Sequence, residues 1–206
     1  MNFDNRKSTK NWAEVNWDRD LWIPVPLTFE GTMWADAAEW ALHYASDRAE
    51  RTYGELTKKV LRKEVKPRAM SFVDAQKDLA GKLPAHKFYM HFPNAHTAPV
   101  PVGVGLWDPQ GTREEAFQYY AYWTAQNATE PPVAEWFDTE ALGRGVKAQW
   151  RAMEDSKPVW AVNYIFRNEE FATDVHVFTG CADNERFQEV LPDLDDLVRH
   201  IRCAPR

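Results

Sequence analysis

The chain has 206 residues and a formal net charge of −6, with 44% of its residues hydrophobic and 27% charged. Disordered chains are poor in aromatic residues, so the ten tryptophans exclude a disordered protein. Glycine and proline are scattered without a period, which excludes collagen-like and low-complexity material. A chain of about 200 residues buries roughly 70% of its unfolded surface, so we expect a folded protein with a sizeable core.

Cysteine content and the N-terminal sequence indicate a cellular compartment. The two cysteines, Cys181 and Cys203, make neither a disulfide framework nor a zinc site. The N-terminal segment lacks the apolar stretch of a secretory signal, and no run of residues is apolar enough to span a bilayer. We therefore expect a cytoplasmic protein with no membrane partner.

Residues 1–20 are mostly polar and predict an irregular arm. Trp12, Trp17 and Trp22 are five residues apart, a spacing that keeps them off a common face in both a helix and a strand. We expect these rings to attach the arm to a single domain that comprises residues 21–206.

The rest of the chain predicts groups of helices that alternate with groups of strands. Residues 21–29 alternate like a strand, and Pro24 and Pro26 restrict that strand to the edge of a sheet. Thr112 and Glu115 form a capping box that opens a helix running to about Gln126. The other expected helices are 32–51, 53–63 and 71–82, the last two separated by Pro67, and a final one after Asp183. The other expected strands are 87–92, 100–107, 145–153, 159–167 and 171–180, with a loop over 130–143.

This order of elements favours an α+β fold. The connectors between the last three strands are hairpin-sized, which predicts an antiparallel meander. Residues 159–166 are apolar on both faces and therefore predict a central strand. We expect a mostly antiparallel sheet of about six strands, covered by helices on both faces.

Residues 48–68 are the basic part of an acidic chain. They carry eight lysines and arginines against three glutamates, whereas the other residues carry 17 basic and 28 acidic side chains. A solvated helix face with ion pairs such as Glu55–Lys59 accounts for this segment, and an anionic partner is the alternative. Only Tyr53 supplies an aromatic ring among these charges, so we do not expect nucleic acid as a partner.

The C-terminal half resembles a known family. The stretch VPVGVGLWDPQGTREEAFQYYA, the three strands from GRGVKAQW to VFTG and the terminal amphipathic helix resemble PsbP-like domains, most of all their actinobacterial LpqN-type branch. The resemblance lies in element order and hydrophobic rhythm. It implies an α/β/α sandwich and a non-catalytic role in associating with a protein or ligand, and it implies no site residue.

Two glycines distinguish the expected strand 100–107. Gly103 and Gly105 have the spacing of the first two glycines of a dinucleotide-binding turn. The third glycine of that motif is missing, and the segment is strand-like. They give the strand one face of small residues, where we expect a helix or an aromatic ring to pack closely.

Histidines offer the only candidates for catalytic chemistry. His86, His91 and His96 are five residues apart, which places the first two on opposite faces of a strand, so we expect no metal and no other cofactor. His91 and His176, with Asp174 as the nearby carboxylate, become an enzyme site if the fold brings them into one pocket.

Aromatic side chains give the clearest candidate for a binding surface. The helix that begins after Thr112 carries two aromatic stripes, and the sheet can cover only one of them. Rings from the arm or from the 130–143 loop either cover the second stripe or extend it. The candidate surface comprises Trp12, Trp17, Tyr119, Tyr122, Trp123 and Trp136.

Three function hypotheses follow from these features. The first is a non-enzymatic module that binds a protein or a small ligand through the aromatic surface, which also makes a homo-oligomer possible. The second is a small hydrolase or metal-dependent enzyme that uses His91 and His176. The third is an acidic, immunity-type inhibitor of a basic partner.

Overall fold

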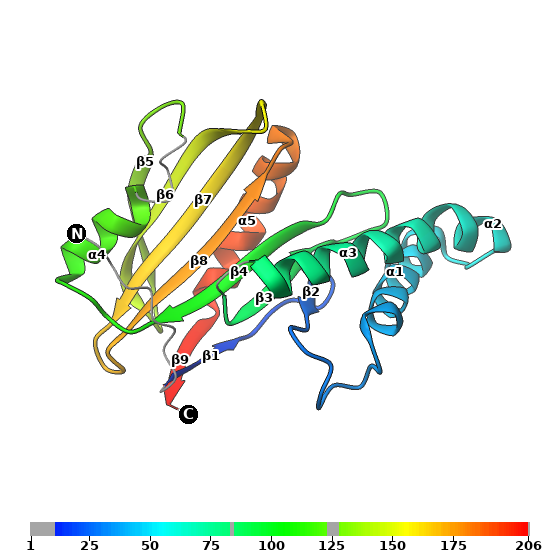
Figure 1. Ribbon diagram of the computed structural model, residues 1–206, viewed down its shortest axis with the longest axis horizontal. Coiled ribbons are helices and arrows are strands. Elements are labelled where there is room, and N and C mark those ends of the chain that lie inside the picture. The colour runs from blue at the N-terminus through cyan, green and yellow to red at the C-terminus, as the bar shows by residue number, and fades with distance from the viewer. Residues whose placement is uncertain (1–10, 83–84, 123–127, 206) are drawn as a thin grey trace. The chain divides into compact units, whose positions relative to one another are not determined.

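A computed structural model describes residues 11–82, 85–122 and 128–205 of the chain (Figure 1). The chain forms two compact units. Unit 1 comprises Met1–Asp18, Pro84–His86 and Val100–Arg206, and unit 2 comprises Arg19–Leu83 and Lys87–Pro99. The expected single domain over 21–206 contributes residues to both units and stays a prediction, because a compact unit need not fold on its own.

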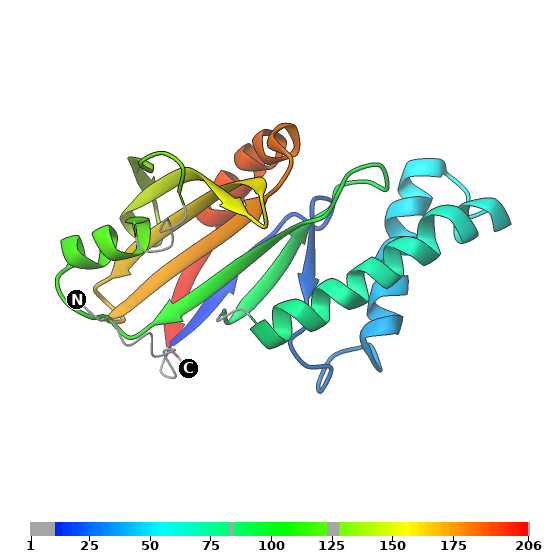
Figure 2. The ribbon, with the colours of Figure 1, turned by 45° about the horizontal axis from the view of Figure 1, so that its top comes forward.

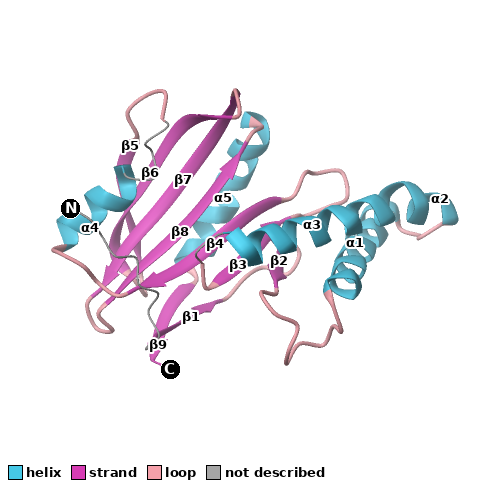
Figure 3. Ribbon diagram, in the orientation of Figure 1, coloured by secondary structure: helices cyan, strands magenta, loops and turns pink. Residues whose placement is uncertain are grey.

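Unit 2 joins a strand pair to a group of helices (Figure 3). Asp36 caps its first helix by accepting hydrogen bonds from the Ala38 and Glu39 amides at 2.9 Å. The helix ends at Gly54, whose φ of 77° is the left-handed geometry of a C-cap. The elements are β2 (Trp22–Val25), α1 (Ala37–Tyr53), α2 (Lys58–Val60), the π-helix η1 (Leu61–Val65), α3 (Lys66–Lys82) and β3 (Lys87–His91).

The helix break expected at Pro67 is wrong. A proline ring inside an α-helix collides with the carbonyl four residues earlier, which here belongs to Lys63. The chain widens its turn instead, and the Lys66 amide donates to the Leu61 carbonyl five residues back. Helical structure therefore runs on through α2, η1 and α3.

The core of unit 2 is aromatic. Trp40 and Phe72 are fully buried, with ring centroids 6.0 Å apart, and Phe72 meets Phe92 at 5.1 Å. The buried Arg48 donates hydrogen bonds to the backbone carbonyls of Phe92 and Arg19. This guanidinium therefore ties helix α1 to the two segments that flank the β2–β3 pair.

Unit 1 contains an antiparallel sheet of strand order β4-β8-β7-β6-β5. The expected meander is confirmed, and Asp155 and Ser156, both with positive φ, make the two-residue turn between β6 and β7. Its elements are β1 (Asn11–Val15), β4 (Val100–Trp107), α4 (Arg113–Tyr122), β5 (Val133–Thr139), β6 (Gly143–Glu154), β7 (Lys157–Asn168), β8 (Thr173–Cys181), α5 (Asn184–Arg199) and β9 (Ile201–Pro205).

Two neighbouring residues of β7 show where the helices of unit 1 pack. The Asn163 amide donates to the carbonyl of Tyr120 in α4, and the Tyr164 hydroxyl donates to Asp195 in α5. Successive side chains of a strand point to opposite faces. Asn163 thus bonds to α4, and Tyr164, the next residue of the strand, bonds to α5 (Figure 2). The chain is α+β, with antiparallel strand pairing throughout the described ladders.

Two expectations about irregular segments are wrong. The arm contains strand β1, which pairs with β9 at the other end of the chain. The expected loop over 130–143 contains strand β5, which pairs with β6 along its whole length. In both cases the pairing partner supplies backbone hydrogen bonds that a short segment's own composition does not reveal.

The close packing expected at the glycines of β4 is confirmed. A Cβ on Gly103 would lie 2.4 Å from the Phe178 ring, and one on Gly105 would lie 2.9 Å from the Trp107 indole nitrogen. Aromatic rings therefore lie directly over the backbone at both positions, where no larger side chain fits without displacing them.

Candidate functional site

Helix α4 positions the central part of the candidate surface. Its capping box is formed in full: the Thr112 amide donates to the Glu115 carboxylate at 2.8 Å, and the Glu115 amide donates to the Thr112 hydroxyl at 3.2 Å. The buried Arg167 also donates to the Gln110 and Gly111 carbonyls just before the helix. The start of α4 is therefore fixed to the sheet.

One aromatic stripe of α4 faces the sheet. Phe117, Tyr120 and Ala121 are buried in a cluster with Val146 and Ile165, and Tyr119 packs partly buried against it. The site candidate Tyr122 ends the helix, and nothing is described of its side chain. The site candidate Trp123 lies outside the described residues.

Trp136 lies on β5 and remains exposed. Its side chain is 64% accessible, and its ring meets Phe117 of α4 edge to face. Between α4 and the neighbouring strands runs a groove of about 210 Å³, which we call the α4–β5 groove. It is lined by Glu114, Phe117, Gln118, Ala121, Ala134, Trp136 and Val146.

Strand β5 lies at the edge of the sheet, with β6 as its partner on one side. Its sequence, VAEWFDT, contains neither proline, lysine nor arginine, and its register with β6 has no bulge. Proline, lysine and bulges are the devices that usually protect an edge strand against pairing with another chain. Val133 and Trp136 are both largely exposed.

Each acidic residue of β5 lies near a basic side chain of β6. Asp138 accepts two hydrogen bonds from Arg144, at 2.8 and 3.2 Å, and these bonds lower the pKa of the carboxyl group. Glu135 is exposed, with its carboxylate 4.0 Å from the Lys147 ammonium. The Lys147 ammonium is bound more closely by Asp195, at 2.8 Å.

The two tryptophans of the arm differ in exposure. Trp12 lies on β1 and is 43% exposed, whereas its neighbour Ala13 is fully buried. Trp17 follows the strand and is half-buried. Both rings belong to unit 1.

The histidine candidates lie in different units. His91 is buried in unit 2, where its ring meets Trp22 at 4.9 Å. His176 is buried in unit 1 between Tyr120 and Phe178, each 5.1 Å away, and this burial lowers its pKa to about 3. Each imidazole is therefore packed among aromatic rings of its own unit.

Asp174, the candidate carboxylate, is already paired. It is buried and accepts hydrogen bonds from both the Nε and the Nη2 of Arg167. Among the residues that the structure describes, no three or more histidine, cysteine, aspartate or glutamate side chains are grouped so as to hold a metal ion.

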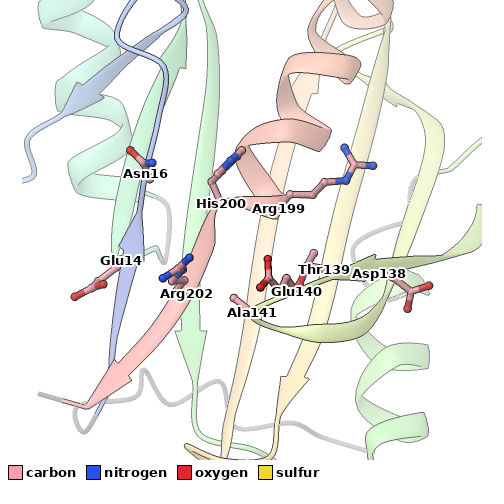
Figure 4. Close-up of a pocket in the computed structure, with 9 residues that line it drawn as sticks. All are labelled: Glu14, Asn16, Asp138, Thr139, Glu140, Ala141, Arg199, His200 and Arg202. Atoms are coloured by element: carbon pink, nitrogen blue, oxygen red, sulfur yellow. The ribbon is translucent and has the colours of Figure 1, made fainter.

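A polar pocket of about 550 Å³ lies in unit 1, at the C-terminal end of α5 (Figure 4). Sequence reasoning missed this pocket because its walls come from β1, β5 and β9, and none of these segments was predicted to be a strand. The signal available was the group of basic and imidazole side chains at the end of the helix, Arg199, His200 and Arg202. The pocket is lined by Glu14, Asn16, Asp138, Thr139, Glu140, Ala141, Arg199, His200 and Arg202.

The basic segment of unit 2 forms a stripe. Five cationic side chains at helical spacing are exposed along α2, η1 and the start of α3, and no ion pair within the described part of the chain includes them. The expected Glu55–Lys59 pair is therefore not formed. These side chains are Lys58, Lys59, Arg62, Lys63 and Lys66.

Comparison with known proteins gives one structural similarity. No protein-family model matches the chain, and no curated protein matches it. Among solved structures, the chain is similar to LpqN of Mycobacterium tuberculosis, a protein involved in cell envelope biogenesis. The TM-score is 0.48 and the identity 8%, over 98% of this chain and 87% of that one. The expected LpqN-type resemblance is thus confirmed as a resemblance.

No helix among the described residues is both long enough and apolar enough to cross a bilayer.

Proposed function

We propose that the protein is a non-enzymatic interaction module that binds an extended peptide segment of a partner protein. The segment adds as a strand to the edge of β5 that no described strand occupies, and it places alternate side chains in the α4–β5 groove. The observation that carries this proposal is an edge strand that lacks proline, lysine and bulges, beside an apolar groove that contains an exposed tryptophan.

Strand addition uses two kinds of contact. The backbone of an edge strand provides a row of hydrogen-bonding groups, which gives affinity for any extended chain. Side chains of the added strand alternate between faces, so those on the α4 side reach the groove and meet Phe117 and Trp136. Aromatic rings that are already fixed by a helix and a strand make contacts at a low cost in conformational entropy.

Charge indicates which segment fits. Strand β5 carries Glu135 and Asp138 and no basic residue, and Glu114 lines the groove. A second copy of the chain that paired through β5 would bring like charges together in one ladder, which is unfavourable. A peptide with basic residues between its apolar positions matches the surface, in keeping with the acidic character of the whole chain.

We also propose that unit 1 is a PsbP-like α/β/α sandwich, with α4 and α5 as its outer layers, and that the protein acts in the cytoplasm. The contacts of Asn163 and Tyr164 with the two helices support the sandwich. The absence of disulfide bonds supports a reducing compartment, since both cysteines are free.

The test uses a fluorescent synthetic peptide of alternating valine and lysine, about eight residues long, so that it spans β5. Its valine–glutamate counterpart is the control for charge. We expect the lysine peptide alone to bind, as measured by fluorescence anisotropy. Hydrogen exchange of the β5 amides should slow in the complex, because strand addition protects them.

Trp136→Ala should weaken binding of the lysine peptide by about tenfold or more. Trp12→Ala is the matched control, because it removes another exposed tryptophan of unit 1. Equal binding by both variants, unchanged exchange at β5, or equal binding of the glutamate peptide would each refute the proposal. Analytical ultracentrifugation of the chain without peptide gives a further test. A dimer that the Trp136→Ala change dissociates would also refute the proposal, because a second copy of the chain would then occupy the edge of β5.

A further inference from the structure

The polar pocket at the end of α5 has the size of a small-molecule site. Its volume of about 550 Å³ falls within the range of roughly 300–1,000 Å³ that is typical of ligand sites. Its walls come from β1, the end of α5, β9 and the turn between β5 and β6 (Figure 4). All these elements belong to unit 1.

Two of the polar side chains that line the pocket already have partners. Asp138 is bound by Arg144 through two hydrogen bonds. The His200 imidazole lies with Nδ1 2.8 Å from the Asp196 carbonyl oxygen, one turn earlier in α5. These contacts hold the two side chains to neighbouring residues and leave other groups to meet a ligand.

Like Glu14, Arg202 and Glu140 remain available to a ligand. Figure 4 shows them on facing sides of the pocket, Arg202 on β9 and Glu140 on the turn after β5. Neither side chain makes an ion pair or a hydrogen bond within the described residues. Glu14 lies directly opposite Arg202 in the β1–β9 register, yet the two do not form an ion pair either.

The cationic wall has a second member in Arg199. Its guanidinium carbon lies 4.8 Å from the centre of the Phe137 ring, a cation–π contact that orients the side chain. Asn16 contributes a neutral amide on the His200 side of the pocket, and its backbone N–H donates to the His200 carbonyl at 3.2 Å (Figure 4). The pocket therefore presents the arginines Arg199 and Arg202, the carboxylates of Glu14 and Glu140, and a neutral amide.

We infer that this pocket binds a small zwitterion that carries a carboxylate and an ammonium group, as α-amino acids and short peptides do. The carboxylate pairs with Arg202, and the ammonium pairs with Glu140. A simple anion would lie against Glu140 and a simple cation against Arg202, so each would meet a repulsive charge in the same pocket. This inference is independent of peptide binding at β5.

The test is titration calorimetry of the full chain with a panel of free amino acids and dipeptides. Each compound is compared with its N-acetylated form, which lacks the ammonium group, and its C-amidated form, which lacks the carboxylate. We expect at least one free zwitterion to bind about tenfold or more tightly than both blocked forms.

Two variants assign each charge to its partner. In Arg202→Gln, the free and amidated forms should bind equally, because the carboxylate has lost its partner. In Glu140→Gln, the free and N-acetylated forms should bind equally. Arg151→Gln, on an exposed position of β6 outside the pocket, should leave the preference for the free form intact.

Three results would overturn the inference. One is that no compound in the panel distinguishes its free form from its blocked forms. Another is binding of inorganic phosphate that Glu140→Gln strengthens and that the zwitterions do not compete with, which would make this an anion site. The third is that Arg202→Gln and Glu140→Gln both retain the preference for the free form.

Discussion

Trp136 and Phe117 meet edge to face at one end of the α4–β5 groove, with ring centroids 6.3 Å apart and planes inclined by 64°. The two rings differ in burial, because Phe117 is in the core and Trp136 is largely exposed. The Arg144 guanidinium lies 5.9 Å from the centre of the Trp136 ring. The tryptophan is thus held in place by its neighbours while most of its surface stays accessible to a partner.

The difference in burial predicts a difference in stability. Phe117→Ala should lower the free energy of unfolding by about 3–5 kcal/mol, the usual cost of removing a core phenylalanine. Trp136→Ala should lower it by less than about 1 kcal/mol, since little apolar surface leaves the core. Urea denaturation measures both values. A loss as large for Trp136→Ala as for Phe117→Ala would show that the tryptophan serves packing rather than binding.

Gly103→Ala should destabilise the protein by about 1–3 kcal/mol, because the new methyl group overlaps the Phe178 ring. Gly180→Ala is the milder control, since its nearest neighbour would be 3.3 Å away. Combining Gly103→Ala with Phe178→Leu should cost less than the sum of the two single changes. Strictly additive losses in thermal unfolding would contradict the overlap as the cause.

Asp195→Asn should lower the free energy of unfolding by about 3–5 kcal/mol. Asp195 neutralises the buried Lys147 at 2.8 Å and accepts a hydrogen bond from the buried Tyr164. Its removal leaves the buried ammonium group with only the exposed Glu135 carboxylate, 4.0 Å away, as a nearby counter-charge. The neighbouring Asp196 is exposed, and Asp196→Asn should cost far less. Adding Lys147→Met to Asp195→Asn should restore part of the loss, and its failure to do so would argue against an uncompensated charge.

The burial of His176 predicts that the free energy of unfolding falls at acidic pH. Burial lowers the pKa of the folded imidazole to about 3, whereas the unfolded chain takes up this proton below about pH 6.5. The stability from keeping His176 neutral is therefore fully present above about pH 6.5 and is lost as the pH falls toward 3, with a slope of up to about 1.4 kcal/mol per pH unit. His176→Phe should flatten the dependence of unfolding free energy on pH over this window. An unchanged slope would contradict the assigned burial.

Much of unit 1 could be predicted because local signals agree with the final packing. The capping box at Thr112 and the N-cap at Asp183 mark helix starts that the structure retains. Strand β4 matches its predicted range because a long apolar run with small residues fits a buried strand. The first aromatic stripe of α4 faces the sheet because helical periodicity alone determines which side chains share a face.

The elements that sequence reasoning missed depend on distant partners. Strands β1 and β9 come from opposite ends of the chain, and neither is apolar enough to predict the other. Strand β5 mixes polar and apolar residues on both faces because one face covers Tyr164 while the other borders the groove. The polar pocket follows from these same strands. Its lining residues converge only once β1, β5 and β9 are in place.

The wide turn before Pro67 makes two sequence features depend on each other. The turn needs one residue more than a regular α-helix, and the proline needs the room that this residue provides. Deleting one residue from 61–65 returns the proline ring to a collision, whereas replacing Pro67 alone leaves a wide turn that nothing requires. In an evolving lineage, neither change is neutral without the other. We therefore expect the extra residue of the wide turn and Pro67 to be kept together or lost together in related sequences.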